Sequence, residues 1–270
     1  MTIRIFTVDA FTAQPFAGNP AAVCLLDDVP AVPGDAWMQA VAAEMNLSET
    51  AFLRRQPDSR AFALCWFTPV VEVPLCGHAT LASAHVLFEQ GILSIDEPAE
   101  FDTLSGRLSA RHTSRGITLD FPLQPVERIP DADVPDALRE GLGVAPVEIT
   151  GNSDRFVVQL GDEETLRNLQ PDLRQLSTLQ RGTVVTCRSE TPAFDFLSRN
   201  FLPHRGIPED PVTGAAHCSL AHFWSLKLGK DKFTAYQASK RGGTLGVEII
   251  DERVRLTGQA VTVLHGVLER

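Results

Sequence analysis

The chain has 270 residues, of which 44% are hydrophobic and 21% are charged, a composition typical of a globular protein with buried cores. Acidic residues outnumber basic residues by 34 to 24, so the formal net charge is −10. A negative field repels phosphate backbones and anionic lipid, which disfavours nucleic acids and membranes as partners. A small anionic ligand is still compatible with this charge, because helix N-termini attract anions locally.

The opening residues 1–6 are typical of a first strand rather than of a signal peptide. No apolar run reaches the roughly 18 residues that a membrane span needs. The cysteines are odd in number and contain no CxxC spacing, so the sequence predicts neither a disulfide framework nor a metal site. We therefore expect a cytoplasmic protein that uses no metal. The five cysteines are Cys24, Cys65, Cys76, Cys187 and Cys218.

Two stretches of the chain resemble each other. Residues 72–79 (EVPLCGHA) align with residues 209–216 (EDPVTGAA) at an offset of 137, and the same offset places Ala84-His85 on Ala221-His222. A further match, at an offset of 133, joins Gly18-Asn19 to Gly151-Asn152. Several matches in the same order predict two copies of one structural unit, each about half of the chain.

A proline-rich segment separates the two copies. Residues 121–130 read FPLQPVERIP, and Pro135 follows shortly after. Prolines at this density suit a connection rather than a helix or a central strand. We therefore predict domains at residues 1–122 and 136–270, with a last strand that can return to the first domain.

Each copy contains one long helical pattern, at residues 77–90 and at residues 214–228, and each pattern is closed by a glycine, Gly91 or Gly229. Both patterns are apolar almost all the way round, up to Leu226 in the second, and a helix without a polar face is normally enclosed. The sequence thus predicts an α/β (α+β) fold. We expect two pseudo-symmetric domains, each a curved, mostly antiparallel sheet or barrel wrapped around a central helix.

Glu49 is the first candidate for chemistry. In a strand that covers residues 47–53, Glu49 shares a face with Leu47, Ala51 and Leu53, the face that should point inward. A buried carboxyl is costly unless it is paired or used, and burial raises its pKa toward the range useful for proton transfer. The alternatives are an edge strand or an arginine that neutralises Glu49.

The two helix starts form the second candidate. Gly77 and Gly214-Ala215 open the helices without a blocking side chain, so the first-turn N–H groups and the helix dipole are available to an anion. If the two copies face each other, both helix starts converge on one inter-domain cleft that suits a carboxylate. The alternative is that these glycines only permit close packing.

Two polar residues stand at these helix starts, His78 in the first turn of one helix and Asp210 shortly before the other. Each residue can contact a substrate or simply cap backbone groups. Cys76 suggests a racemase with two cysteines, one on each face of a carbon acid. The repeat disfavours this reading, because Thr213 occupies the position that matches Cys76.

The motifs together resemble those of the phenazine-biosynthesis (PhzF-like) family, which shares the diaminopimelate epimerase fold. No single motif is specific, but the combination runs through nearly the whole chain in the expected order. The segments are residues 8–11 (VDAF), 16–23 (FAGNPAAV), 45–52 (MNLSETAF), 67–69 (FTP), 72–80 (EVPLCGHAT) and 209–214 (EDPVTG).

The resemblance implies two pseudo-symmetric domains around a substrate cleft, with no organic cofactor and no metal. It implies that Glu49 matches the catalytic acid/base and that His78 and Asp210 match polar groups around the substrate. The family often has serine where this chain has Ala215, so a hydroxyl that would touch the substrate is missing. The residues that match the substrate-holding helix starts are Gly77, Thr213, Gly214 and Ala215.

We therefore expect a cofactor-independent isomerase that acts on a small carboxylate, with Glu49 moving the proton, and a homodimer is a further possibility. Within enzymes, the alternative is a two-base epimerase or racemase. Outside enzymes, the alternative is a binding or regulatory protein that keeps the cleft without turnover.

Overall fold

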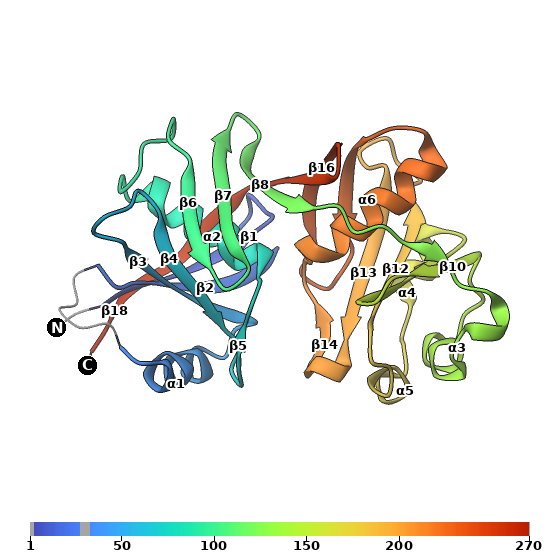
Figure 1. The fold of residues 1–270 in the computed structure, drawn as a ribbon. Helices are drawn as coiled ribbons and strands as arrows, with labels where there is room; N and C mark the ends of the chain where they lie inside the picture. Colours follow the sequence, from blue (N-terminus) through green and yellow to red (C-terminus); the bar gives the residue numbers. More distant parts are fainter. Residues whose placement is uncertain (1–2, 28–32, 270) are drawn as a thin grey trace. The chain divides into compact units, whose positions relative to one another are not determined.

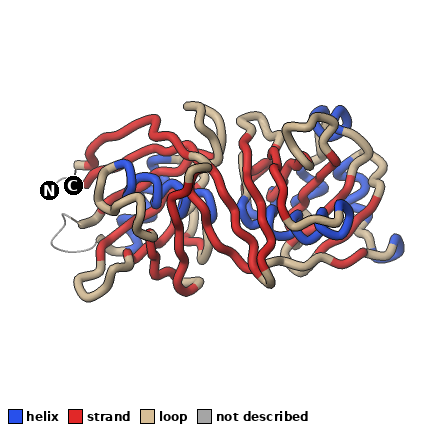
Figure 2. Tube along the Cα trace, turned by 90° about the horizontal axis from the view of Figure 1, so that it is seen from above, coloured by secondary structure: helices blue, strands red, loops and turns tan. Residues whose placement is uncertain are grey.

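A computed structural model describes residues 3–27 and 33–269. The chain forms two compact units, one of residues 1–120 with 257–270 and the other of residues 121–256. The mixed α/β architecture expected from the sequence is confirmed: curved sheet dominates, and few helices accompany it (Figure 1, Figure 2). Within the described ranges, every helix is too short or too polar to cross a bilayer.

The first unit begins and ends with two antiparallel neighbours, β1 and β18, which pair from Ile3 opposite Leu268 to Ala10 opposite Ala260. A long helix, α2, packs against β1, β2 and β3. The elements of this unit are β1 (Ile3–Ala10), β2 (Asn19–Leu25), α1 (Asp35–Met45), β3 (Glu49–Arg55), β4 (Phe62–Phe67), β5 (Glu72–Val73), α2 (Gly77–Glu89), β6 (Ala99–Thr103), β7 (Gly106–Thr113), β8 (Gly116–Pro122) and β18 (Ala260–Leu268).

The second unit contains the proline-rich segment, which is not an unstructured linker. Its β9 pairs with β10, and a short 3-10 helix follows. The elements are β9 (Glu127–Arg128), η1 (Asp131–Asp133), α3 (Asp136–Leu142), β10 (Glu148–Gly151), β11 (Arg155–Gln159), α4 (Glu163–Asn168), α5 (Leu173–Ser177), β12 (Gly182–Arg188), β13 (Phe196–Leu202), η2 (Pro203–Arg205), β14 (Ile207–Asp210), α6 (Gly214–Leu228), β15 (Lys232–Gln237), β16 (Gly243–Ile250) and β17 (Arg253–Gly258).

The sheet pairings repeat between the units. In the first unit, β2 with β3 and β4 with β6 run parallel, while β3 with β4 and β6 with β7 run antiparallel. In the second unit, β11 with β12 and β13 with β15 run parallel, while β12 with β13 and β15 with β16 run antiparallel. The repeated sequence blocks therefore correspond to a repeated strand order.

Helix α2 is enclosed along almost its whole length, because ten of its residues are buried. Helix α6 has the expected bounds and ends at Gly229, whose φ of 63° suits a glycine. The expectation that α6 is enclosed throughout was wrong at its last turn, where Leu226 is 73% exposed. An apolar residue near a helix end can remain in solvent, because the sheet covers only the preceding turns.

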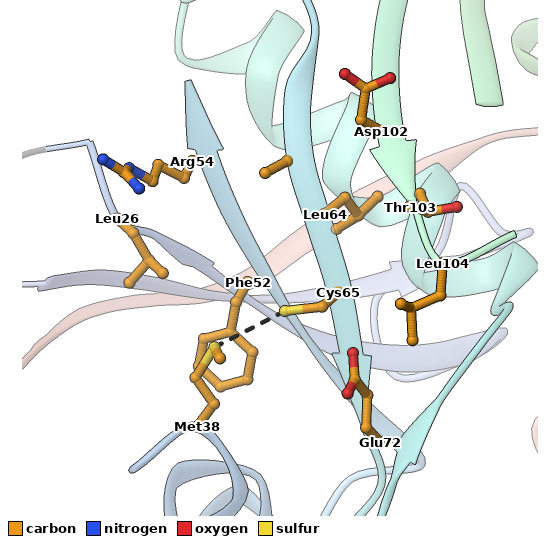
Figure 3. Close-up of a pocket in the computed structure, with 11 residues that line it drawn as sticks. Leu26, Met38, Phe52, Arg54, Leu64, Cys65, Glu72, Asp102, Thr103 and Leu104 are labelled. Atoms are coloured by element: carbon orange, nitrogen blue, oxygen red, sulfur yellow. Dashed lines mark hydrogen bonds between the residues drawn. The ribbon is translucent and has the colours of Figure 1, made fainter. Parts of the chain in front are cut away.

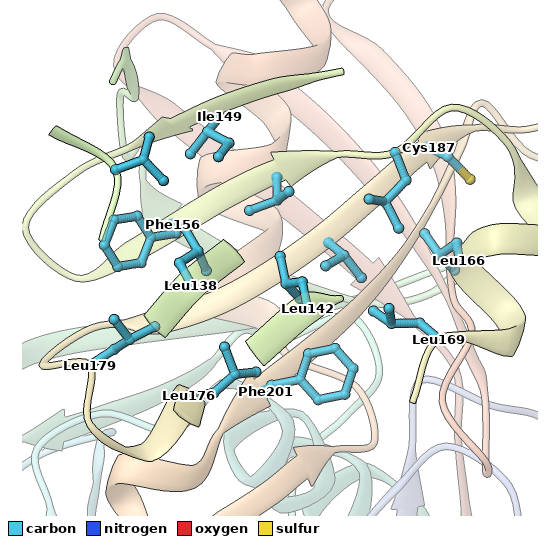
Figure 4. Close-up of a cluster of buried hydrophobic side chains, with 14 of the residues drawn as sticks. Leu138, Leu142, Ile149, Phe156, Leu166, Leu169, Leu176, Leu179, Cys187 and Phe201 are labelled. Atoms are coloured by element: carbon cyan, nitrogen blue, oxygen red, sulfur yellow. The ribbon is translucent and has the colours of Figure 1, made fainter. Parts of the chain in front are cut away.

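The sheet of each unit is covered on a second face as well. In the first unit, α1 packs through Met38 and Ala42 on a cluster that includes Ile3, Phe52 and Phe67. In the second unit, the short helices α3, α4 and α5 cover a larger apolar cluster (Figure 4). Its largest members include Leu138, Leu142, Phe156, Leu166, Leu176 and Phe201.

Burial on both faces changes the interpretation of β3. The sequence predicted that Ala51 and Leu53 face inward and that Phe52 faces outward, but all three residues are buried. Phe52 packs toward α1, and Leu47 precedes the strand and packs against that same cluster. The predicted inward positions Ala51 and Leu53 are buried, but alternation did not distinguish them from Phe52, because it separates core from solvent only where one face of the sheet is wet.

Two leucines of α6 give a matched test of this packing. Leu220→Ala removes a fully buried side chain and should lower the free energy of unfolding by about 2–5 kcal/mol. Leu226→Ala, on the exposed last turn, should change it by less than about 0.5 kcal/mol. Urea unfolding of both variants measures the difference, and equal losses would contradict the described burial of the helix.

Candidate active site

Three strand and helix starts bring polar side chains together in the first unit. Glu49 is the first residue of β3, which pairs in parallel with β2 so that Ala21 lies opposite Glu49. Asn19 is the first residue of β2, and His78 lies in the first turn of α2. The helix packs on both strands, so the three side chains meet at one end of the sheet.

The contacts centre on the His78 ring. Its Nε2 lies 3.2 Å from Glu49 Oε2, and the two side chains are only 6% and 12% exposed. Its Nδ1 lies 3.2 Å from the amide nitrogen of Asn19 and 3.5 Å from the Cys76 sulfur. The two sequence candidates Glu49 and His78 are thus direct neighbours, and Asn19 and Cys76 hold the other side of the ring.

This arrangement favours one form of the imidazole. An amide N–H and a thiol S–H both donate hydrogen bonds, so Nδ1 acts as the acceptor and the proton sits on Nε2, toward Glu49. Burial lowers the pKa of His78 to about 3, so the ring is neutral near pH 7. His78 therefore lies beside the Glu49 carboxylate as a neutral ring that is a poor base near pH 7.

The start of α2 adds a positive electrostatic end to this group. The N-cap residue is Cys76, whose side chain does not cap the helix in the described structure, and Gly77 follows as the first helical residue. The first-turn N–H groups of a helix have no helical acceptors and favour negative charge. Gly77 therefore stands, as predicted, at an uncapped helix start, next to His78.

The other sequence candidates come together in the second unit. Asp210 ends β14, Thr213 is the N-cap of α6, and Gly214 and Ala215 are its first two residues. The Thr213 hydroxyl donates to the Asp210 carboxylate. Asp210 is therefore a buried hydrogen-bond acceptor beside the helix start, and not its N-cap.

Two amides that sequence reasoning missed hold this second group. Asn200 donates to the Thr213 hydroxyl at 2.9 Å. Gln237 accepts from the Thr213 backbone N–H at 2.8 Å and donates to the Asp210 carbonyl at 2.7 Å. These residues lie far from Asp210 in the sequence, on β13 and β15, and no local motif announces them.

One signal could have revealed Asn19. It belongs to the repeated Gly-Asn pair, and its counterpart is Asn152. Asn19 contacts His78 on α2, and the Asn152 amide donates to Ser219 on α6 at 3.3 Å. In both units, the repeated asparagine therefore links a strand start or turn to the long helix.

The acid and imidazole have no counterparts in the second unit. The parallel pair β11 and β12 begins with Arg155 opposite Gly182, where the first unit has Ala21 opposite Glu49. Ala215 is the second residue of α6, as His78 is of α2. The repeat thus conserves the scaffold and carries the Glu49–His78 pair in one unit only.

A separate hollow in the first unit does not contain these groups. It is an open pocket of about 380 Å³ beside β3 and β4, where the Cys65 thiol contacts the Met38 sulfur at 3.8 Å (Figure 3). Burial raises the pKa of Cys65 to about 12, so this thiol is not a nucleophile near pH 7. The remaining lining is mostly apolar, with Arg54, Glu72 and Asp102 as its charged members.

The class of fold is that of the epimerases. A hydroxyproline epimerase of Agrobacterium vitis superposes with a TM-score of 0.62 over 99% of this chain and 92% of its own, at 14% identity, which shows the fold alone. A phenazine biosynthesis protein of the PhzF family from Enterococcus faecalis superposes with a TM-score of 0.92, at 38% identity and full coverage of both chains.

The family model for phenazine biosynthesis-like proteins matches residues 8–266. An uncharacterized isomerase of Halalkalibacterium halodurans is 48% identical over 269 residues, which cover 99% of both proteins. The chain belongs to the phenazine biosynthesis-like family. The family membership expected from the sequence motifs is thereby confirmed.

Two buried histidines make the site sensitive to acid. Burial lowers the pKa of His78 to about 3 and that of His217 to about 4, whereas a histidine in the unfolded chain titrates near 6.5. Between these values the unfolded chain binds protons that the folded chain does not, so the free energy of unfolding should fall as the pH drops below about 6.5. Urea unfolding at pH 7 and pH 5 measures the loss.

The same shift is visible in the ring signals. NMR of the folded protein should show no titration of His78 or His217 between pH 8 and pH 5, while the urea-unfolded chain titrates normally and serves as the control. A His78 signal that titrates near pH 6.5 in the folded state would contradict the neutral ring described above.

Gln237 provides a test of the second group. Gln237→Ala removes the partners of two buried backbone groups and should lower the free energy of unfolding by roughly 1–3 kcal/mol. Gln170→Ala, at an exposed position of the same unit, should cost less than about 0.5 kcal/mol. Chemical denaturation of both variants measures the effect, and a neutral Gln237→Ala would mean that this network does not hold Thr213.

Proposed function

We propose that this protein is a cofactor-independent isomerase that acts on a small carboxylate, with Glu49 as the acid/base. The observation that carries this proposal is the buried carboxylate of Glu49, 3.2 Å from a neutral imidazole at the start of an enclosed helix. Relatives that match almost the whole chain are named isomerases, which supports the same class.

In the proposed reaction, the Glu49 carboxylate removes a proton from a carbon next to an electron-withdrawing group. The electron pair left on that carbon forms a new double bond to its neighbour, and the electrons of the existing double bond take up a proton from Glu49 at the far carbon. The protonated Glu49 can exchange its proton with water before this second transfer. Substrate and product are therefore isomers, and neither an oxidant nor a leaving group is needed. A positioned acid/base of this kind contributes about 10²–10⁴-fold to the rate.

His78 assists Glu49 in this scheme without exchanging the proton itself. The Nε2 of this neutral ring lies 3.2 Å from Glu49 Oε2, so the ring packs against the carboxylate and restricts its orientation. Asn19 and Cys76 hold the ring from its Nδ1 side. The orientation of the Glu49 carboxylate is thus set by His78, and the orientation of His78 is set by Asn19 and Cys76.

A carboxylate substrate fits the helix starts. The N–H groups that follow Gly77 lie in the same first turn as His78, and the helix dipole favours an anion there. Gly214 begins α6 in the same way, so Gly214, Thr213, Ala215 and Asp210 remain predicted substrate contacts. Ala215 presents a methyl group and no hydroxyl, which favours a substrate different from that of members with serine.

The two-base epimerase is the less favoured alternative. It needs a second acid/base, but Thr213 stands where the first unit has Cys76, and Gly182 begins the strand that corresponds to the one begun by Glu49. A non-catalytic binding protein is the other alternative. Solvent deuterium separates the cases, because an isomerase exchanges carbon-bound hydrogen of its ligand with water and a binding protein does not.

Glu49→Gln keeps the shape of the side chain and removes its ability to carry a proton. Turnover, or deuterium incorporation into a small carboxylate found to bind, should fall by about 10²–10⁴-fold, while ligand affinity changes far less. Glu44→Gln, at an exposed position on α1, is the matched control and should retain full activity. Mass spectrometry of the ligand after incubation in D₂O measures the incorporation.

A Glu49→Gln variant that turns over at the wild-type rate would overturn the role proposed for Glu49. Asp210 would then become the candidate for the base. A ligand that binds wild-type protein without any exchange would instead favour the binding protein.

A further inference from the structure

Three donors of different chemistry meet at the start of α2. The Glu49 carboxylate, the Cys76 thiol and the His78 ring each place one ligand atom within 4.8 Å of the other two. Cys76 and His78 are buried, and Glu49 is 12% exposed. Sequence spacing gave no sign of this group, because Glu49 comes from a strand 27 residues before Cys76 in the chain.

We propose that Glu49, Cys76 and His78 form a binding site for Zn²⁺, and that the bound ion blocks proton transfer by Glu49. Thiolate, imidazole and carboxylate are the ligands that zinc uses in proteins. The soft sulfur favours zinc over magnesium or calcium, which prefer sites made of oxygen ligands. Three protein ligands leave the fourth position to water.

The distance between Glu49 and His78 suits a tetrahedral ion, whereas the Cys76 sulfur lies beside the other ring nitrogen and has to move toward the ion. Zinc bonds of about 2.0–2.3 Å place ligand atoms roughly 3.3–3.6 Å apart. His78 Nε2 and Glu49 Oε2 are already 3.2 Å apart, and the Cys76 sulfur lies 3.5 Å from the same ring at Nδ1. Rotation of the Cys76 side chain about its Cα–Cβ bond is the adjustment that brings the sulfur toward the ion.

The surroundings of His78 suit a metal ligand. A ligating histidine usually donates its second ring N–H to an oxygen, and the Asn19 amide lies 3.2 Å from Nδ1. Turning that amide by 180° about its last bond presents its oxygen to Nδ1–H.

The positive end of α2 stabilises the two anionic ligands and destabilises the bound cation, because it attracts anionic ligands and repels a nearby cation. Two anionic ligands offset the charge of Zn²⁺, so the complete site with a neutral imidazole is uncharged. A doubly charged ion is therefore buried here without an unpaired charge.

The ion and the reaction use the same carboxylate. A Glu49 oxygen that is bound to zinc cannot accept a proton from carbon, so zinc should inhibit the proposed isomerase. This consequence rests on the proposed function, whereas metal binding itself does not. The two are therefore tested separately, and binding is measured without any substrate.

The binding experiment uses the full-length protein after treatment with a chelator, with Zn²⁺ and Co²⁺ as probes. We expect one Zn²⁺ per chain by calorimetry, and a thiolate-to-metal charge-transfer band with Co²⁺ in the near ultraviolet. Cys76→Ser should remove that band and weaken zinc binding by more than tenfold. Cys65→Ser is the matched control and should leave both unchanged, because the Cys65 thiol contacts Met38 instead.

Two further variants keep the test decisive. Glu49→Gln should also weaken zinc binding by more than tenfold, and Asn19→Ala should weaken it by about 10–100-fold, the usual effect of losing a partner of a ligating histidine. Circular dichroism establishes that each variant folds, and Glu49→Gln carries the test if Cys76→Ser does not fold. Zinc should raise the melting temperature of wild type and Cys65→Ser but not of Glu49→Gln.

The proposal is overturned if wild-type protein shows no charge-transfer band, or if Cys76→Ser and Glu49→Gln bind zinc as tightly as Cys65→Ser. Either result leaves the role of Glu49 in proton transfer untouched. Conversely, zinc binding that depends on Cys76 and Glu49 in a protein without deuterium exchange would support the metal site and count against the isomerase.

Discussion

The contact between Glu49 and His78 is the interaction on which the rest of the site depends. A carboxylate at 12% exposure is costly without a partner, and here the partner is a ring whose other nitrogen is held by an amide and a thiol. Each member comes from the start of a different element, so the contact also fixes β2, β3 and α2 at one end of the sheet. The buried polar group thus specifies the geometry of the core as well as the chemistry.

Helices cover both faces of the sheet in the first unit, and this packing explains why Glu49 and His78 meet at one end of the sheet. Helix α1 and its apolar cluster occupy one face, and α2 packs on β1, β2 and β3. The parallel pairing of β2 with β3 brings two strand starts, Asn19 and Glu49, to the same end. Helix α2 begins at this end with an uncapped first turn, so the positive end of the helix, the carboxylate and the histidine are placed together by topology.

Patterns of neighbouring residues in the sequence predicted those features of the fold that depend on neighbouring residues. The apolar runs that end at a glycine predicted both bounds of α6 correctly and placed the end of α2 one residue too late. They did so because the end of a helix depends on the residues next to it. The repeat predicted the duplicated strand order, and the motifs predicted the family. The placement of Leu47 on the same face as Glu49 and the burial of Leu226 were predicted wrongly, since each depends on which element covers the residue. Asn19, Asn200 and Gln237 were missed because their partners lie far away in the sequence.

The two units differ at the positions that correspond to the site, and the packing of the second unit accounts for part of this difference. At Gly182, which begins the strand corresponding to β3, an added Cβ would lie 2.6 Å from the Leu202 side chain. A larger residue there would have to move the end of the Leu202 side chain, and a carboxylate would in addition need a hydrogen-bond partner that Ala215 cannot provide. The second unit instead ties Asp210 to Thr213, and both to Gln237, while the His217 ring contacts the Thr213 carbonyl at 2.8 Å and not the Asp210 carboxylate. The matching positions of the second unit, Thr213 and Ala215, therefore carry neither the thiol of Cys76 nor the imidazole of His78, and the close contact between Glu49 and His78 belongs to the first unit.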